Sequence, residues 1–495
     1  MRSFAARAVA LTAVLSATGV GMAIAGPLDP PSAGCTDPGS STDPACLPTA
    51  VVGHQLRQAC DYQWVEGCEL TGLEDPGYAV TSDPSGRRAA FEWKVGALHE
   101  HSGYSDGDID SVPRDYFEAA KTGVNASGTG VKLDFLFSSE HTDNAQITPT
   151  TNASCVTDPT RTVDCSHVED NSFSWKWPAT LRQARESSTP TFTGMRGFEW
   201  TNDFYNHMNV FFSTNFRNVK VDGSYLSMER MWDWLQRPVA EGGGADALVT
   251  FNHPGGNPKL SPFDGGFPHG ELLGENTTLD NWNEVAYVPA VDSRVVGMEV
   301  NGGEDIEWFV KALTNGWHIG PVAAEDHHER SWASKEMRKT MVLTKGSNPT
   351  PKDYYWAVAN RRLVSLGAEL VGGAPGTPAV VPTIDFTADG GKHVLGSRVP
   401  MGVGRKAKHS LAVATSGLPA GSRVALVGSA AGALASPVQL GAVGADGTFS
   451  GEHAVRTESP QWWFTVVCPP ASSLTAPACG TDREYSALTA PIWFE

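Results

Sequence analysis

Basic residues are scarce in this chain: 37 Lys and Arg stand against 55 Asp and Glu, which gives a formal net charge of -18 over 495 residues. This shortage argues against a nucleic acid or an anionic membrane as the main partner, because phosphate groups bind Lys and Arg. After its first 25 residues the chain also lacks an apolar run long enough to span a bilayer. We therefore expect a small-molecule partner, with no nucleic acid and no membrane span.

The eight cysteines never stand in a Cys-x-x-Cys spacing, which argues against a zinc ribbon. Their spacing favours pairs of near neighbours, although other pairings are compatible with the sequence. The expected disulfides are Cys35 with Cys46, Cys60 with Cys68, Cys155 with Cys165, and Cys468 with Cys479. Disulfides form in oxidising compartments, so this pattern indicates an exported protein.

The first 25 residues have the features of a secretory signal peptide. Arg2 and Arg7 give a charged start, an Ala-rich apolar run follows, and Ala23-Ile24-Ala25 is a small-residue cleavage site. The alternative is an N-terminal membrane anchor, which the Thr, Ser and Gly within the run disfavour. We expect a secreted or extracytoplasmic protein whose signal peptide is removed near Ala25.

The rest of the chain divides into four segments by composition. Residues 26–86 are rich in Cys and Pro, and residues 87–370 alternate apolar strand runs with helix-like stretches at 116–121, 227–235, 306–313 and 352–362. This alternation predicts an α/β domain with a barrel-like sheet. Residues 371–383 are a Gly, Ala and Pro-rich linker, and residues 384–495 contain short, turn-separated strands that predict a small β-sandwich.

The most informative stretch is residues 99–107, His-Glu-His-Ser-Gly-Tyr-Ser-Asp-Gly. Residues 91–98 before it are typical of a strand, so His99 and His101 project from one face of its end. Two imidazoles on one face can share an ion, and Asp106 adds a charged oxygen ligand. This arrangement predicts the start of a metal site.

More histidines and carboxylates stand beside later apolar runs, mostly at the C-terminal ends of predicted strands. These runs are 133–138, 192–198, 247–251 and 321–324, and the side chains beside them are His141, Glu199, His253, Asp326 and His328, while His207 opens a further apolar run. Side chains at the C-terminal ends of strands are where barrel folds place their chemistry. Clustered imidazoles and carboxylates would be costly to bury without an ion.

The series His-x-His with Ser-Asp-Gly, a later His, a Glu and a His, a His-Pro pair and a final Asp-x-His resembles the polymerase and histidinol phosphatase (PHP) superfamily in content and order. The resemblance covers roughly the middle three fifths of the chain. It implies a distorted (β/α)7 barrel and two or three divalent ions. Mixed ligation by His and carboxylates is compatible with Zn, Mn or Fe. It also implies nine metal ligands, namely His99, His101, Asp106, His141, Glu199, His207, His253, Asp326 and His328.

Three features bear on how this pattern applies. Glu140 stands where the superfamily usually has Asp, so hydrogen bonds from this longer side chain would be repositioned. The stretch 142–190 between the second and third motifs is long, and we interpret it as a loop excursion over the pocket rim. His327 competes with His328 for the last motif, which the Asp-x-His spacing assigns to His328.

The resemblance implies an exported metal-dependent phosphoesterase in which a metal-bound hydroxide attacks phosphorus and no side-chain general acid is assigned. Three divalent ions less the charges of Asp106, Glu199 and Asp326 would leave about three positive charges, which suits an anionic phosphate ester. Arg330 and Arg196 are candidates to hold the phosphate, against the alternative that each is a solvated surface arginine.

Two other functions fit the same sequence. PHP-like proteins with a trailing β-domain also resemble the carbaryl hydrolase group, whose metal centre cleaves a carbamate or carboxylic ester, and residues 487–492 echo that group. The alternative from another class is a non-catalytic cell-surface binding protein. Loss of ligands would be the mark of that alternative, and every expected ligand is present.

Overall fold

The computed structural model describes residues 91–108, 111–142, 173–202, 204–221, 224–254, 272–273, 281–401, 407–430, 433–434, 437–470, 472, 474–475, 477–480 and 484–495. The expected signal peptide (1–25) and Cys- and Pro-rich segment (26–86) lie outside the described residues, as do Cys35, Cys46, Cys60, Cys68, Cys155 and Cys165. The disulfide between Cys468 and Cys479 is confirmed, and it is consistent with an extracytoplasmic location. Among the described residues, the helices are all too short or too polar to cross a bilayer.

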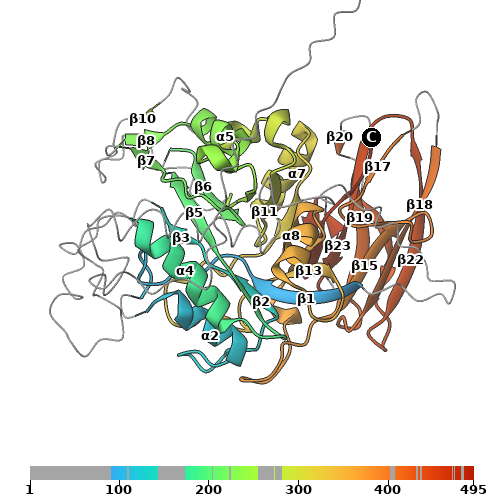
Figure 1. Cartoon of the computed structure of the whole chain (residues 1–495). Coiled ribbons are helices and arrows are strands. Elements are labelled where there is room, and N and C mark those ends of the chain that lie inside the picture. The colour runs from blue at the N-terminus through green and yellow to red at the C-terminus, as the bar shows by residue number, and fades with distance from the viewer. Residues whose placement is uncertain are drawn as a thin grey trace, which may run out of the picture.

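The fold is mixed α/β and mostly strands, as Figure 1 shows. The helices are α2 (Pro113–Thr122), α4 (Phe173–Ser187), α5 (Met228–Gln236), α6 (Trp282–Val285), α7 (Asp305–Asn315) and α8 (Pro351–Ala359), with short 3-10 turns η3 (Val239–Glu241), η4 (Pro289–Val291) and η5 (Ala368–Leu370). The strands up to the expected linker are β1 (Phe91–Ala97), β2 (Phe135–Phe137), β3 (Glu140–His141), β4 (Thr193–Met195), β5 (Gly197–Asn202), β6 (Asn206–Phe211), β7 (Lys220–Val221), β8 (Ser224–Leu226), β9 (Leu248–Phe251), β10 (Leu272–Leu273), β11 (Val295–Glu299), β12 (Gly320–Val322), β13 (Lys339–Lys345) and β14 (Leu363–Leu366).

The strands of this first region lie in two main sheets. One has the order β12-β11-β9-β6-β5-β3, and the other contains β14-β13-β1-β2-β4. Among the described residues, strand pairing does not close into a ring, so the expected (β/α)7 barrel is borne out only as a mixed α/β arrangement. The division has a local cause, because short breaks at Ser138–Ser139 and at Arg196 separate β2 from β3 and β4 from β5 and pass each run from one sheet to the other.

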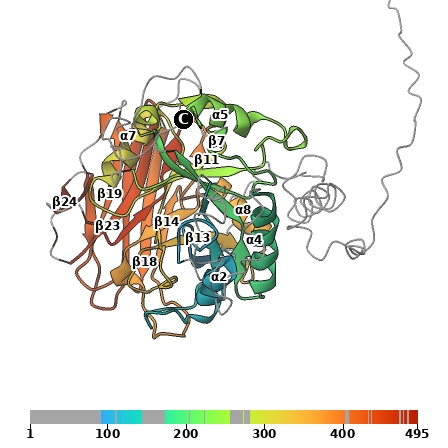
Figure 2. The same ribbon diagram turned by 90° about the vertical axis from the view of Figure 1, so that its left-hand side faces the viewer.

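The four helix-like stretches expected from the sequence correspond to α2, α5, α7 and α8. The interpretation of residues 142–190 as a loop was wrong for their C-terminal part, where α4 forms. Trp177, Leu181 and Ala184 of this helix are buried. The helix packs against β4 and against α2, which lies beside it in Figure 2. The sequence contains Pro178 within this stretch, and because proline is expected to end helices, the sequence alone does not predict a helix here.

The C-terminal strands are β15 (Thr383–Ala388), β16 (His393–Val394), β17 (Arg398–Val399), β18 (Ala407–Ser416), β19 (Arg423–Ala430), β20 (Ala433–Leu434), β21 (Val438–Ala442), β22 (Phe449–Thr457), β23 (Gln461–Cys468), β24 (Leu474–Thr475), β25 (Ala478–Cys479), β26 (Ala487–Thr489) and β27 (Ile492–Phe494). They form a four-stranded sheet, β16-β15-β18-β22, facing a second sheet built on β23. That second sheet continues into the first region, because β26 pairs with β14. The two regions therefore share one 12-stranded sheet, and two buried apolar clusters contain residues of both.

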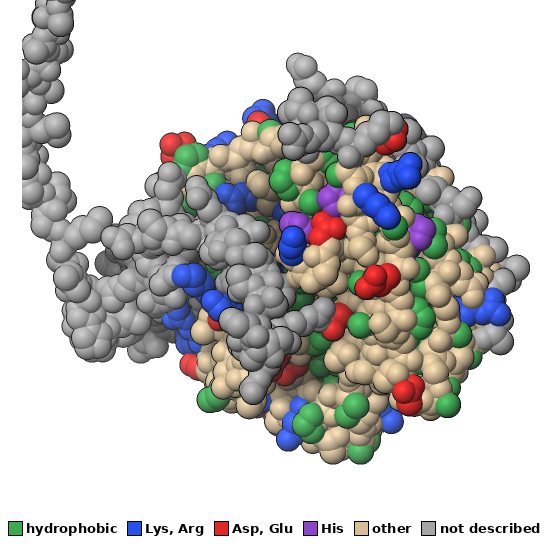
Figure 3. Space-filling model, turned by 90° about the vertical axis from the view of Figure 1, so that its right-hand side faces the viewer, with side chains coloured by type: hydrophobic (Ala, Val, Ile, Leu, Met, Phe, Trp, Pro, Cys, Tyr) green, Lys and Arg blue, Asp and Glu red, His purple; other side chains and the backbone are tan. Residues whose placement is uncertain are grey.

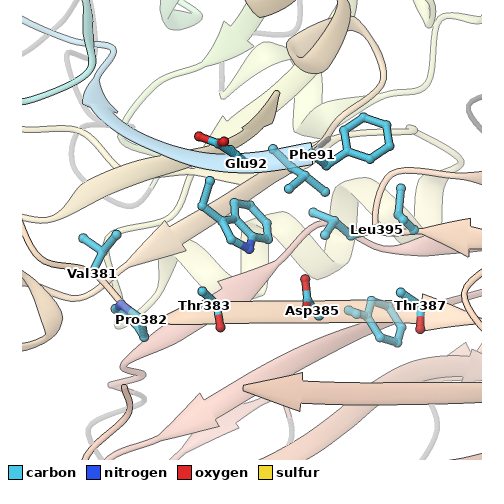
Figure 4. Close-up of a pocket in the computed structure, with 12 residues that line it drawn as sticks. Phe91, Glu92, Val381, Pro382, Thr383, Asp385, Thr387 and Leu395 are labelled. Carbon is cyan, nitrogen blue, oxygen red and sulfur yellow. The ribbon is translucent and has the colours of Figure 1, made fainter. Parts of the chain in front are cut away.

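The face of the C-terminal region in Figure 3 carries Lys and Arg interspersed with Asp and Glu rather than gathered in one patch. A cleft of about 440 Å³ lies where β1 meets β15, lined by Phe91, Glu92, Thr383 and Asp385 among others (Figure 4). None of the candidate metal ligands lines this cleft.

The helix α6 is a single turn in the left-handed conformation. The φ angles of Trp282, Asn283, Glu284 and Val285 are 46°, 54°, 60° and 52°. For residues other than glycine this conformation costs roughly 1–2 kcal/mol each, so surrounding contacts must hold the turn in place. Trp282 and Val285 are buried in the core.

A buried histidine joins the two regions at the C-terminus. His318 Nδ1 lies 2.7 Å from Asp292 Oδ2, and its Nε2 lies 2.8 Å from Glu495 Oε2. Burial alone would lower the pKa of His318, but the hydrogen bonds to Asp292 and Glu495 raise it above its ordinary value. The hydrogen bond from His318 lowers the pKa of Glu495 to about 2.

These shifts predict how this contact responds to pH. The contribution of His318 to the free energy of unfolding is fully present below the pKa of about 6.5 that it has in the unfolded chain. It is lost as pH rises through the higher pKa of His318 in the folded protein. The Glu495 contribution is present above about pH 4.3 and is lost as pH falls toward 2. Between pH 5.5 and 8.5, we expect the free energy of unfolding, measured by urea denaturation, to fall less in His318→Gln than in the unaltered protein. An identical loss in both proteins would contradict this role.

Candidate metal centre

The motif at residues 99–107 follows β1 and pairs with residues 325–328. Asp326 N donates to His99 O, and His101 N donates to His327 O, each at 3.0 Å. His99 and His101 are two residues apart on one extended segment and so share a face, and the Asp326 side chain approaches the imidazoles of both from the paired segment. His328 joins them, and its ring stacks on that of His101 with centroids 4.2 Å apart.

The turn after His101 is fixed by its glycine and by Glu140. A Cβ on Gly107 would lie 2.8 Å from the backbone of Ser102, so only glycine fits this position. Ser102 Oγ and Ser105 Oγ donate to Glu140 at 2.5 and 2.6 Å, and Tyr116 OH donates to it at 3.2 Å. Glu140 therefore holds the turn that carries Asp106.

The structure brings all nine expected ligands together. Three groups of side chains have ligand atoms within 4.8 Å of one another: His101, Asp106, His141 and His328; His99, His101 and Glu199; and His141, Glu199 and His207. Each pair of groups shares one residue, His101, His141 or Glu199. Asp326 Oδ1 lies 3.4 Å from His99 Nε2 and 3.2 Å from His101 Nε2.

Glu199, on β5, lies at the centre of the cluster. Its carboxylate oxygens lie 3.2 Å from His99 Nε2, 3.3 Å from His141 Nε2, 3.2 Å from His207 Nδ1 and 3.3 Å from His253 Nε2. Its side chain is 1% exposed. A carboxylate with two oxygens among four imidazoles can bridge neighbouring ions.

Several observations indicate that the residues fit cations. The Nε2 atoms of His99 and His101 and the Oε2 atom of Glu199 are buried and form no well-aligned hydrogen bond, although charged neighbours lie 3.2–3.3 Å away. Such atoms are costly to bury unless an ion satisfies them. The backbones of His253 and Asp326 have φ angles of 29° and 50°. Such strain in residues other than glycine collects at functional sites.

Charge within the cluster shifts its pKa values in opposite directions. Burial alone would raise the pKa of Glu199, but His207, His99 and His141 hold it well below its usual range. Burial opposes the shift of His328 too, yet the hydrogen bond to Asp106 raises its pKa to about 9. The carboxylates thus stay ionised and draw positive charge, whether protons or metal ions.

Two buried residues that the sequence analysis missed support the ligands from behind. Glu299 Oε1 lies 2.6 Å from His99 Nδ1, and Glu299 Oε2 accepts a hydrogen bond from His253 N at 2.7 Å. Asn252 Nδ2 donates to Glu199 Oε1 at 2.7 Å. Such partners orient ligating side chains. The available signal was a single acid at position 299 within the apolar run of β11, since a buried charge needs a partner.

The two arginines proposed as phosphate ligands lie in different surroundings. Arg330 Nη2 lies 3.7 Å from Asp115 Oδ2, and Arg330 Nε lies 4.0 Å from Asp108 Oδ2, beside the Asp106 turn. Arg196 is 8% exposed and packs over the Trp177 ring at 3.4 Å. It donates to the carbonyl oxygens of Trp177 and Ser213. We interpret Arg196 as a structural residue, neither a solvated arginine nor one of the cluster.

A second charged group lies on the reverse face of the same two segments. Glu100, Glu325 and His327 come within 4.8 Å of one another, and Lys339 Nζ lies 2.8 Å from Glu325 Oε1. Burial and the neighbouring Glu325 raise the pKa of Glu100 well above its ordinary value, which favours its uncharged form. Lys339 is fully buried and also donates to backbone carbonyls.

Removing Lys339 leaves the Glu325 charge buried without its partner. We expect Lys339→Met to lower the free energy of unfolding by about 3–5 kcal/mol, measured by urea denaturation. Lys311→Met is the control, because Lys311 pairs with Glu284 on the surface and such pairs contribute about 0–1 kcal/mol. Equal, small effects of the two substitutions would contradict the importance of the buried pair.

Comparison with known proteins adds little to this geometry. No family model matches the chain, and no curated protein matches it. Among solved structures, PsfC from Pseudomonas syringae is 14% identical over 53% of this chain and 88% of its own, with a TM-score of 0.29. An engineered protein is 11% identical over 77% of this chain and 80% of its own, with a TM-score of 0.15. These scores are too low to support an argument about fold or function.

Proposed function

We propose that this protein is an exported, metal-dependent hydrolase of the PHP type that cleaves phosphate esters. The observation that carries the proposal is the convergence of nine histidines and carboxylates, expected in that order from the sequence, in one cluster with Glu199 at its centre. We also propose that the two main sheets of the first region are parts of one distorted barrel, with the cluster at the C-terminal ends of its strands.

The ligand groups suggest places for two or three divalent ions, Zn, Mn or Fe. His101, Asp106, His141 and His328 would hold one, His99, His101, Glu199 and Asp326 another, and His141, Glu199, His207 and His253 a third. When bound, the ions would acidify water to give a nucleophile near neutral pH and stabilise charge on the phosphoryl oxygens. Glu299 would fix the His99 ring through Nδ1, so that Nε2 faces the centre.

Charge favours a phosphate ester over a neutral carbamate or carboxylic ester. Three divalent ions would bring six positive charges, from which Asp106, Glu199 and Asp326 remove three and an ionised Glu299 removes a fourth. A net charge of about two remains to attract an anion. Arg330, beside the Asp106 turn, is the side chain we assign to the substrate phosphate.

The test is a paired substrate screen on the reconstituted protein. Aryl phosphate mono- and diesters are compared with aryl carbamates and aryl carboxylic esters at equal concentration. We expect turnover of the phosphate esters that stops when a chelator is added. Turnover of carbamates or carboxylic esters alone would replace phosphoester chemistry with that of the carbaryl hydrolase type. Bound metal without any turnover would favour a binding protein.

A further inference from the structure

The left-handed turn α6 and Asn281, the residue directly before it, contact both segments that carry the His207 half of the cluster. Trp282 Nε1 donates to His207 O at 3.2 Å. On the other side, Asn281 Nδ2 donates to Pro254 O at 2.5 Å, directly after His253. One short turn thus connects the backbones at His207 and His253, which come from β6 and from the end of β9.

A second amide completes this connection. Asn206 Nδ2 donates to Asn281 Oδ1 at 3.1 Å and lies 3.5 Å from His253 O. Asn206 has a φ of 86°, and His253 a φ of 29°. Asn206, Asn281 and Trp282 are at most 4% exposed. Buried hydrogen bonds of Asn206, Asn281 and Trp282 therefore join the two ligand-bearing segments, in which Asn206 and His253 have uncommon φ angles.

The backbone of α6 is itself strained. Its four residues occupy a region of φ that side chains other than glycine rarely adopt. The Trp282 ring also packs on Phe251 at 4.6 Å between centroids, directly before the loop that leads to His253. Strained backbone persists where surrounding structure over-determines it, and it collects where geometry is functional.

We infer that Asn281 and Trp282 are positioning residues for the metal centre, setting the separation of the His207 and His253 imidazoles around Glu199. This inference rests on the proposed function and adds to it two residues that position one part of the metal centre. Groups that orient metal ligands typically change metal affinity by about 10–100-fold when removed. The effect is expected at the ion that His141, Glu199, His207 and His253 would hold, because the hydrogen bonds of Trp282 and Asn281 reach the backbone at His207 and at Pro254, directly after His253.

The test is a zinc titration of the chelator-stripped full-length protein against a competing chelator. Trp282→Phe keeps an aromatic ring against Phe251 but removes the donor to His207 O. The matched control is Trp234→Phe, because Trp234 is equally buried in the same core and its Nε1 donates to Gly242 O, away from the cluster. We expect Trp282→Phe to weaken the binding of one zinc ion about 10–100-fold, while Trp234→Phe binds zinc like the unaltered protein. Excess zinc should restore activity in Trp282→Phe.

Asn281→Ala tests the same inference from the other side, because it removes the contact to Pro254 O and leaves the aromatic packing intact. Metal-free thermal unfolding separates a loss of stability from a loss of zinc affinity. If the zinc dissociation constants of both variants lie within twofold of that of the unaltered protein, the inference is overturned and the proposed function still stands. Tight zinc binding by the unaltered protein without ester turnover would overturn the function and leave the inference standing.

Discussion

Replacing His99 and His101 together by alanine is expected to lower phosphate ester hydrolysis by at least about a thousandfold and to remove most of the bound metal. Both imidazoles are fully buried, and His101 belongs to two of the three overlapping ligand groups. Their loss takes ligands from two ion positions at once. The measurement is the rate of aryl phosphate hydrolysis together with metal content per chain.

The control for this double variant is His409→Ala. His409 is paired with Asp389 at 2.7 Å in the C-terminal region and contributes to none of the ligand groups. It should keep both metal and turnover. Hydrolysis at the unaltered rate in the double His99 and His101 variant would exclude the cluster as the catalytic site.

Glu199→Gln is the second substitution with a large expected effect. It keeps the size of the side chain and removes the charge that contacts four imidazoles. Two of the three ligand groups contain Glu199, whereas His101, Asp106, His141 and His328 do not depend on it. We expect hydrolysis to fall by about a hundredfold or more, with one ion retained per chain.

Glu100→Gln is the matched control for this change. Glu100 is as deeply buried as Glu199 and lies between His99 and His101 in sequence, but it belongs to the group on the reverse face. The same chemical substitution there should leave metal content and hydrolysis close to normal. If both Glu→Gln variants lose metal equally, the division of the two faces into separate groups is wrong.

The clustering of the site could be predicted because its signal lies in order and strand context. Each candidate ligand stands beside an apolar run, and the backbone pairing of residues 99–101 with 325–328 follows from that arrangement. Glu299 and Asn252 carried no such pattern. Their roles depend on which side chains approach them from distant parts of the chain, such as His99 for Glu299, 200 residues away.

The fold could be predicted only in part. Pairing of Val364 with Thr489 joins the C-terminal strands to the sheet of the first region, and contacts between such distant residues leave no local signal in a sequence. The breaks at Ser138–Ser139 and Arg196, which divide the strands between two sheets, are too short to distinguish from continuous strands. Helix α4 was not predicted, because a proline interrupts its helical pattern.

The proposed function requires that the cluster around Glu199 binds divalent ions. The decisive measurement is metal content per chain by elemental analysis, after reconstitution with Zn, Mn or Fe and removal of free metal. We predict two or three ions per chain in the unaltered protein and at most one in the double His99 and His101 variant. Fewer than one ion per chain in the unaltered protein with every metal, or equal content in both proteins, would contradict the account.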